Sequence, residues 1–267
     1  AYAPLCRAGV LALRARDPAR AWKPLARALD SAPAAPLAFS ILWRVREAHG
    51  REGATPILPA LTRRLDELQA AGRLGSADLR ALARVAVDSD GPGAAAGLLE
   101  KGLALKGRSD LADAVDVRVD LARMYARVGR WQDATTQILD AAQREPAPER
   151  KAMLQFLAGD AQERAGAPEA AFEHYLAASR GGYHPHKSLT AADRIASAIG
   201  TVEQRVEVLQ LLIHQGDTDE RVRSLRALSE LYRGPLAKPE RAAGLLRELL
   251  KLRPANTDVI LDLYQLL

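Results

Sequence analysis

Two pairs of arginines at helical spacing are the residues with the most definite chemical potential in this 267-residue chain. Arg80 and Arg84 are four positions apart, and so are Arg123 and Arg127. Residues four apart lie on the same face of a helix. Guanidinium groups bind carboxylates through charge-assisted and often bidentate hydrogen bonds. Together with Arg164 further along the chain, these arginines predict a surface that holds an acidic peptide or a terminal carboxylate.

Acidic residues stand among the same arginines, and they leave a second interpretation open. The carboxylates interleaved with the arginines are Asp88, Asp120, Asp160 and Glu163. Opposite charges one helical turn apart compensate each other, which we also expect around Asp116 and Asp120 with Arg118 and Arg123 nearby. The arginines therefore fit either a dedicated anion site or a solvated face of mixed charge.

No segment has the residues that catalysis or a cofactor needs. Gly91, Gly93 and Gly97 lie close together, but no Lys-Ser or Lys-Thr follows them as in a phosphate-binding loop, and a helix turn explains them. Residues 183–187 read Tyr-His-Pro-His-Lys, which we predict to be a solvated loop because a metal site needs further converging ligands. No nucleophile signature is present. We predict no catalytic, cofactor-binding or metal-binding residue and no enzymatic activity.

The charge balance permits an acidic partner without requiring one. The 38 Lys and Arg residues against 33 Asp and Glu residues give a formal net charge of +5. No run of five like charges forms a basic tail, so nucleic acid is not the expected partner. The single cysteine, Cys6, excludes an intramolecular disulfide. No apolar stretch approaches the roughly 20 residues that a membrane-spanning helix needs.

An alanine followed four residues later by a large apolar residue recurs along the chain. The copies are Ala21/Leu25, Ala54/Leu58, Ala95/Leu99, Ala134/Ile138, Ala171/Tyr175 and Ala242/Leu246. The alanines are 33, 41, 39, 37 and 71 residues apart, and the last interval spans two repeats. Self-similarity at this period is typical of tandem helical hairpins. Ala, Leu and Arg are also strong helix formers, which agrees with an all-α chain.

The fourth repeat is the clearest one. Its first helix is predicted to carry Tyr125 and Val128 on its inner face and to end at Gly129. Its second helix begins at Trp131 and stops before Pro146, because proline cannot donate the helical hydrogen bond. Two helices joined by a tight turn therefore make one repeat.

This fourth repeat resembles a tetratricopeptide (TPR) repeat. The matching residues are Leu121, Ala122, Tyr125, Ala134, Ile138 and Pro146. Arg118 stands where the family has its opening tryptophan. The resemblance implies an all-α fold, a right-handed superhelical solenoid of about seven antiparallel helix hairpins.

The repeats predict one helical domain over residues 1–267. The expected units are 1–34, 35–75, 76–112, 113–148, 149–186, 187–216 and 217–254, and residues 255–267 begin an eighth. The sixth unit lacks the alanine signature, and its helices are expected over 193–199 and from a capping box at 201–204 onward. Asp217 is expected to cap the next helix in the same way. The chain begins without Met and ends in mid-pattern, which indicates a fragment of a longer protein.

In TPR proteins the first helices line a concave groove where partner peptides bind, and the resemblance implies the same use here. The predicted partner-binding residues, which lie on first helices by register, are Trp43, Arg80, Arg84, Arg123, Arg127 and Arg164. The Lys/Asn set of carboxylate-clamp TPR domains is missing, so a chaperone-tail clamp is not expected. We predict a noncatalytic scaffold or adaptor that binds a partner protein or peptide, including an acidic one.

Three alternatives stay open. In the first, the array is the regulatory or substrate-recruiting arm of a larger enzyme or transcription regulator. In the second, its groove arginines bind RNA or another polyanion. In the third, it acts as a spacer that self-associates through exposed end repeats. The sequence names neither a partner nor a compartment. It favours a cytoplasmic location and leaves an exported one open.

Overall fold

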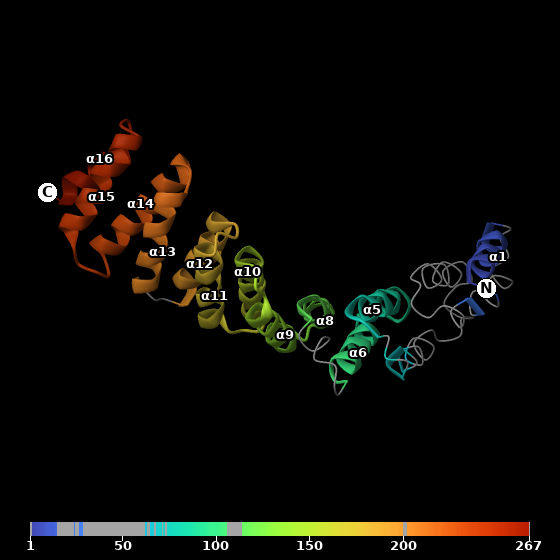
Figure 1. The fold of residues 1–267 in the computed structure, drawn as a ribbon. Helices are drawn as coiled ribbons and strands as arrows, with labels where there is room; N and C mark the ends of the chain where they lie inside the picture. The colour runs from blue at the N-terminus through green and yellow to red at the C-terminus, as the bar shows by residue number, and fades with distance from the viewer. Residues whose placement is uncertain are drawn as a thin grey trace. The chain divides into compact units, whose positions relative to one another are not determined.

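The structure is a computed structural model that describes residues 2–14, 24, 27–28, 62, 65–66, 68–70, 72, 74–105, 114–199 and 202–266. The chain divides into two compact units, Ala1–Arg144 and Glu145–Leu267. Every regular element in the described ranges is an α-helix, and each unit is a succession of such helices (Figure 1). The expected all-α fold built from helical hairpins is confirmed.

Four of the helices described in the first unit form two consecutive hairpins. Helices α5 (Ser76–Asp90) and α6 (Pro92–Leu103) are joined at Gly91, and α8 (Val115–Arg127) and α9 (Trp131–Arg144) are joined by a short turn. Each pair packs together, and α8 also contacts both α5 and α6. Helix α1 (Tyr2–Arg14) lies at the start of the same unit.

In the second unit each described helix packs against the next one along the chain. In order they are α10 (Pro148–Arg164), α11 (Pro168–Arg180), α12 (Pro185–Ile199), α13 (Val202–Gln215), α14 (Thr218–Arg233), α15 (Pro239–Leu252) and α16 (Thr257–Leu266). Their buried faces form one continuous apolar core from α11 to α16.

Proline and aspartate mark where the helices begin. The first residue of α6, α10, α11 and α15 is a proline, whose fixed φ suits that position and whose missing N–H is not needed there. Helix α14 has a side-chain cap instead, since the Asp217 carboxylate accepts a hydrogen bond from the Glu220 backbone N–H at 2.9 Å. The predicted Asp217 cap is confirmed.

A glycine in the left-handed conformation follows α8 and α10, each of which is the first helix of its hairpin. Gly129 after α8 and Gly166 after α10 both have φ of 79°. The next residues, Arg130 and Ala167, donate their backbone N–H to carbonyls five positions back, each at 2.9 Å. This pattern satisfies carbonyls that the end of a helix leaves without partners, and only glycine adopts the conformation at low cost.

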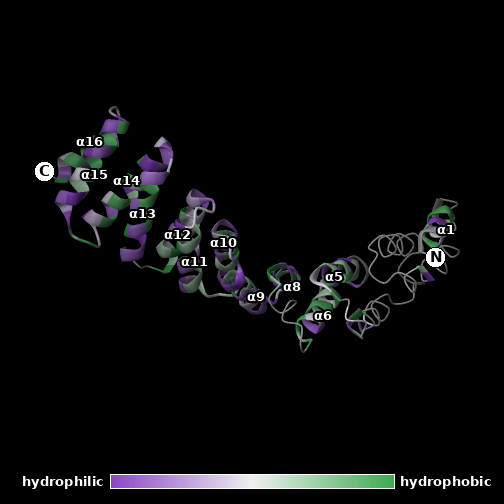
Figure 2. Cartoon of the chain, in the orientation of Figure 1, coloured by the Kyte–Doolittle hydropathy of each residue, from purple (hydrophilic) through white to green (hydrophobic). Residues whose placement is uncertain are grey.

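The recurring alanine and its large partner lie at the centre of the packing. The described alanines Ala95, Ala134, Ala171 and Ala242 are fully buried. Their partners, Leu99, Ile138, Tyr175 and Leu246, are also buried. Figure 2 shows apolar and polar residues sharing the described helices, as expected of helices buried along one face. The sequence repeat is therefore a packing repeat.

Glycine allows the closest helix contacts. A Cβ atom on Gly159 of α10 would lie 2.9 Å from ring atoms of Tyr175 on α11. A Cβ atom on Gly102 of α6 would lie 2.4 Å from a methyl group of Leu79 on α5. Both distances are shorter than a carbon–carbon contact allows. The large side chain of one helix therefore occupies the space that glycine leaves on its neighbour.

One expectation about the buried face of a helix and one about the start of a helix are wrong. Val128 was expected on the inner face of its helix, but it follows the last residue of α8 and is 42% exposed, because the chain already turns there toward Gly129. The first helix of the sixth repeat begins at Pro185 rather than near residue 193. A proline at the first helical position starts α12 eight residues earlier than the apolar pattern indicated.

Other expectations are outside the described residues. These include Trp43 and nearly all of the second predicted unit, 35–75. The division of the whole chain into seven units stays a prediction.

We predict opposite stability effects for alanine at two helical glycines of the second unit. Gly159→Ala is expected to destabilise by about 1–3 kcal/mol, because the added methyl group overlaps the Tyr175 ring. Gly244→Ala is the matched control, since a Cβ atom there meets nothing within 4 Å, and it should stabilise by about 1 kcal/mol through helix propensity. Urea unfolding followed by circular dichroism measures both, and a stabilised Gly159→Ala would contradict the packing described above.

Candidate functional site

Most of the predicted arginines line a hollow between α5 and α8, which are the first helices of the two described hairpins in the first unit. Most of its lining comes from helices α5 and α8, and Leu99 of α6 completes it. Its volume is about 340 Å³. The lining residues are Arg80, Ala83, Arg84, Val87, Leu99, Asp120, Arg123, Met124 and Arg127. The structure thus brings together both arginine pairs that the sequence singles out.

The interior of this arginine hollow is apolar. Ala83, Leu99 and Met124 are buried, and Val87 is half-buried. These side chains are also part of the packing between α5, α6 and α8. An apolar interior edged by guanidinium groups suits a ligand that carries both an apolar side chain and negative charge.

Arg80 is held in the hollow by two carboxylates. Its Nε donates to Asp120 Oδ2 at 2.6 Å, and its Nη1 lies 3.2 Å from Asp116 Oδ2. The hydrogen bond to Asp120 raises the pKa of Arg80 above its ordinary value, and the charges of both aspartates add to this. Arg80 therefore connects α5 to α8. Arg80 both lines the hollow and is held in place by its contacts with α8.

The remaining three arginines have more freedom to meet a ligand. Arg123 is 62% exposed in its side chain and lies 3.2 Å from Asp120 Oδ1. Arg84 and Arg127 are exposed and have no ion-pair partner among the side chains that the structure describes. Four guanidinium groups thus share the hollow with one lining carboxylate, that of Asp120.

The expected compensation of charge within α8 is only partly correct. Arg123 does pair with Asp120 one turn away. Arg118 instead crosses to α9, where its Nη1 donates to Gln137 Oε1 and Asp140 Oδ2, each at 3.0 Å. Arg118 stands at the family's tryptophan position and joins the two helices of its own hairpin by polar contacts.

Arg164 and Trp43 are not placed in the hollow by any described contact. Arg164 belongs to α10 in the second unit, where its Nε donates to Asp160 Oδ2 at 3.1 Å. Trp43 lies outside the described residues. Their predicted roles in partner binding stay predictions.

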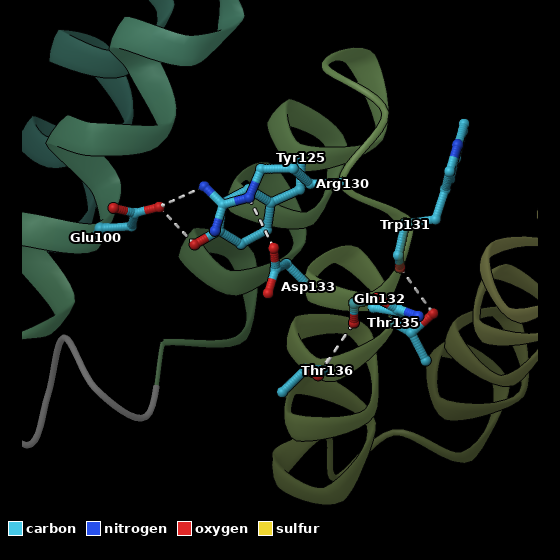
Figure 3. A network of polar contacts seen from close by, with 8 residues as sticks. All are labelled: Glu100, Tyr125, Arg130, Trp131, Gln132, Asp133, Thr135 and Thr136. Carbon is cyan, nitrogen blue, oxygen red and sulfur yellow. Dashed lines mark hydrogen bonds and ion pairs between the residues drawn. The ribbon is translucent and has the colours of Figure 1, made fainter. Parts of the chain in front are cut away.

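A polar network that the sequence did not indicate joins α6 to α8 (Figure 3). The Tyr125 hydroxyl donates to Glu100 Oε1 at 2.6 Å, and Arg130 Nη1 lies 3.4 Å from the same oxygen. The Arg130 guanidinium also lies over the Tyr125 ring, 4.2 Å from its centroid, and pairs with Asp133 at 2.7 Å. Burial, together with the hydrogen bond to Glu100, raises the pKa of Tyr125 to about 12. The Tyr125 hydroxyl therefore already has its partner within the protein.

A second tyrosine–glutamate contact lies in the other unit. Glu163 accepts hydrogen bonds from both Nη atoms of Arg194, at 2.5 and 2.7 Å, and from the Tyr175 hydroxyl at 3.2 Å. The hydrogen bonds from Arg194 hold the pKa of Glu163 below its ordinary value, and burial raises the pKa of Tyr175. No spacing rule connects these residues, because α10, α11 and α12 each contribute one.

The histidine segment is exposed at His184, His186 and Lys187, as the sequence predicted, but only residues 183–184 lie in a loop. Pro185 and the next two residues form the first turn of α12. His186 Nε2 contacts a side-chain oxygen of Glu220, a buried residue near the start of α14. His184 has φ of 40° just before the helix. Within the described residues no group of three or more His, Cys, Asp and Glu side chains could hold a metal ion.

Membrane insertion finds no support in the helices that the structure describes. None of them combines the length and the apolar character that crossing a bilayer requires.

Comparison with known proteins defines the class of fold. No family model matches the chain, and no curated protein matches it in sequence at a significant level. Among solved structures, it is similar to a chain in the structure of Naa15/Naa10 bound to HypK-THB, with 15% identity, a TM-score of 0.50, and coverage of 99% of this chain and 38% of that one. The fold is that of a divergent, TPR-like helical repeat.

Two further solved structures resemble the chain more loosely. One is the C-terminal part of a TPR repeat-containing protein from Cytophaga hutchinsonii, with 12% identity, a TM-score of 0.47, and coverage of 97% of this chain and 99% of that one. The other is YrrB, a TPR protein with an unusual peptide-binding site, with 12% identity, a TM-score of 0.46, and coverage of 76% and 97%. At such identities the likeness concerns the fold alone.

The Tyr125–Glu100 contact predicts a measurable pH effect. Because the pKa of Tyr125 is about 12 in the fold against an ordinary 10.0, the folded state holds this proton more tightly than the unfolded state does. Its contribution to stability is complete below pH 10 and is lost as the pH rises from 10 to 12. Tyr125→Phe should therefore lose less stability than the wild type over that interval.

The urea midpoint measured at pH 9, 10, 11 and 12 tests this expectation. Tyr264→Phe is the control, since the Tyr264 side chain is 81% exposed, and it should follow the wild-type curve. Identical pH dependence in Tyr125→Phe and the wild type would contradict the raised pKa of Tyr125.

Proposed function

We propose that this chain is a noncatalytic interaction scaffold that binds an acidic segment of a partner protein in the arginine hollow between α5 and α8. The observation that carries the proposal is the gathering of Arg80, Arg84, Arg123 and Arg127 around one apolar hollow with a single lining carboxylate. TPR-like arrays present extended surfaces for such binding.

The four arginines take different parts in the proposed binding. Arg80 is already bonded to Asp120 and Asp116 and keeps α5 and α8 in register. Arg84 and Arg127 are exposed on opposite sides of the hollow and offer guanidinium groups to carboxylates of the ligand. Ordering these groups costs side-chain entropy, which charge-assisted bonds to a multivalent acidic segment offset.

The apolar interior favours a peptide over a nucleic acid. Ala83, Val87, Leu99 and Met124 offer no polar group and no aromatic ring for a base to stack on. A volume of about 340 Å³ is enough for one or two apolar side chains. An acidic peptide with an apolar residue between its carboxylates therefore fits better than a phosphate backbone does.

The solved structures with a similar fold agree with a binding role in general terms. One is described as bound to HypK-THB and another as having a peptide-binding site. Those descriptions concern the other proteins. The proposal covers both an independent scaffold and the recruiting arm of a larger protein.

Fluorescence anisotropy with a labelled Glu-Glu-Leu-Glu-Glu peptide tests the proposal. The double variant Arg84→Glu/Arg127→Glu should weaken binding at least about tenfold, since two charged hydrogen bonds become repulsive. Neither arginine has a described ion-pair partner, so the fold should survive. Arg223→Glu/Arg247→Glu is the matched control, because it changes the net charge equally at exposed positions of α14 and α15.

Two outcomes would contradict the proposal. One is equal weakening by both double variants, which would show a response to net charge alone. The other is tighter binding of a single-stranded RNA oligonucleotide than of the peptide, with a steep loss of affinity in salt, which would indicate a polyanion site.

A further inference from the structure

The second unit holds another hollow, which lies between α13, α14 and α15. Its volume is about 370 Å³. The lining residues are Gln210, Ile213, His214, Leu228, Tyr232, Arg241, Gly244, Leu245 and Glu248. Two second helices of neighbouring hairpins form its sides, whereas two first helices form the sides of the arginine hollow. This tyrosine hollow is therefore a separate site on a different kind of surface.

Tyr232 occupies the same repeat position as Tyr125. Each tyrosine lies on the first helix of its hairpin, four residues after a buried leucine, and each is 6% exposed. The surroundings of the two hydroxyl groups differ. The Tyr125 hydroxyl donates to Glu100 of the preceding helix, α6. In the second unit the preceding helix, α13, offers Gln210 and His214 to the hollow and no carboxylate.

The Tyr232 hydroxyl has no protein partner in the described part of the chain. No group there accepts a hydrogen bond from it, and it is not among the polar atoms that are sealed from solvent without a partner. The hydroxyls of the buried residues Tyr125 and Tyr175 both donate to a glutamate. A tyrosine with a buried ring usually finds a partner for its hydroxyl, and because Tyr232 lines the hollow, a ligand bound there can supply that partner.

An arginine stands beside the tyrosine in both units. The Arg130 guanidinium lies 4.2 Å from the centroid of the Tyr125 ring and contacts Glu100. The Arg241 guanidinium lies 5.7 Å from the centroid of the Tyr232 ring and lines the hollow. Arg241 is exposed and has no described ion-pair partner. The second unit thus has the donors of the Glu100 network without its acceptor.

The other described groups around the hollow leave no unpaired negative charge that would repel a bound anion. Its one carboxylate, Glu248, is paired with the Arg221 guanidinium of α14. Ile213, Leu228 and Leu245 supply apolar surface. A carboxylate carried on a short apolar stem therefore matches both the donors and the walls.

Gly244 lines the hollow and has no side chain that would occupy it. It lies inside α15, where glycine costs about 1 kcal/mol of helix stability relative to alanine. A Cβ atom would meet no other atom within 4 Å, so packing does not require glycine here, in contrast to Gly159 and Gly102. A larger side chain at this position would project into the hollow.

We propose that the tyrosine hollow binds the glutamate side chain of a partner peptide, whose carboxylate accepts hydrogen bonds from Tyr232 and Arg241 as Glu100 does from Tyr125 and Arg130. Figure 3 shows the internal arrangement that the bound complex reproduces. The donors are charge-assisted in the same way, and the apolar walls receive the residues that flank the glutamate. The site does not depend on the arginine hollow.

The test uses the whole 267-residue chain labelled with ¹³C in its tyrosine rings, and two peptides. The probe is acetyl-Leu-Glu-Leu-amide, and its neutral control is acetyl-Leu-Gln-Leu-amide. The glutamate peptide should shift the Tyr232 signal in a saturable way, with at least about tenfold tighter binding than the glutamine peptide. The Tyr125 signal should not move, since Glu100 already occupies its hydroxyl. Tyr232→Phe assigns the signal.

Two variants locate the binding. Arg241→Gln should weaken the glutamate peptide about tenfold, whereas Arg247→Gln, an exposed arginine of the same helix that does not line the hollow, should not change it. Gly244→Leu should fill the hollow and abolish the Tyr232 shift without loss of helical content. Equal affinity for the two peptides, or peptide binding that leaves the Tyr232 signal unmoved, would overturn the proposal. Neither result would bear on the arginine hollow, which is tested by its own variants.

Discussion

The close approach of successive helices is the constraint on which the rest of each unit depends. Alanine or glycine on one helix faces a large side chain on the next, as Gly159 faces Tyr175 and Gly102 faces Leu79. Such contacts leave no freedom to slide or rotate one helix against another, because protein interiors are close-packed. Once these apolar contacts between successive helices are fixed, the positions of the polar side chains on the same helices are fixed as well. The arginines of α5 and α8 face one hollow for this reason.

Polar and charged groups near the contacts between helices are of two kinds. Some are bonded across helices, such as Arg80 with Asp120, Tyr125 with Glu100 and Glu163 with Arg194. A partly buried polar group without a partner is costly, so these pairs accompany the packing. Other donors, which line the two hollows, have no partner among the described residues, notably Arg84, Arg127 and the Tyr232 hydroxyl. The contrast between the closed site at Tyr125 and the open one at Tyr232 separates groups that hold the fold from groups available to a ligand.

The sequence predicts the local features of this fold well, because periodicity and capping depend on residues near one another. The buried alanines, the start of α9 at Trp131 and the Asp217 cap follow from spacing of four residues or fewer. The burial expected of Val128 is wrong because α8 already ends at Arg127, and the start expected for α12 is wrong because Pro185 begins the helix. The arginine pairs were found because each lies on a single helix. Arg80 with Asp120, or Tyr125 with Glu100, joins helices of different hairpins, and a single sequence contains no sign of such contacts.

The central claim is that the α5–α8 hollow leaves Arg84 and Arg127 available for carboxylates while Arg80 is already bonded. Nuclear magnetic resonance of the arginine Nε–Hε groups observes this most directly. On addition of the acidic peptide, the signals of Arg84 and Arg127 should shift and become protected from exchange with solvent, and that of Arg80 should stay where its bond to Asp120 holds it. Unmoved signals for Arg84 and Arg127, with shifts at Arg223 or Arg247 instead, would contradict the claim.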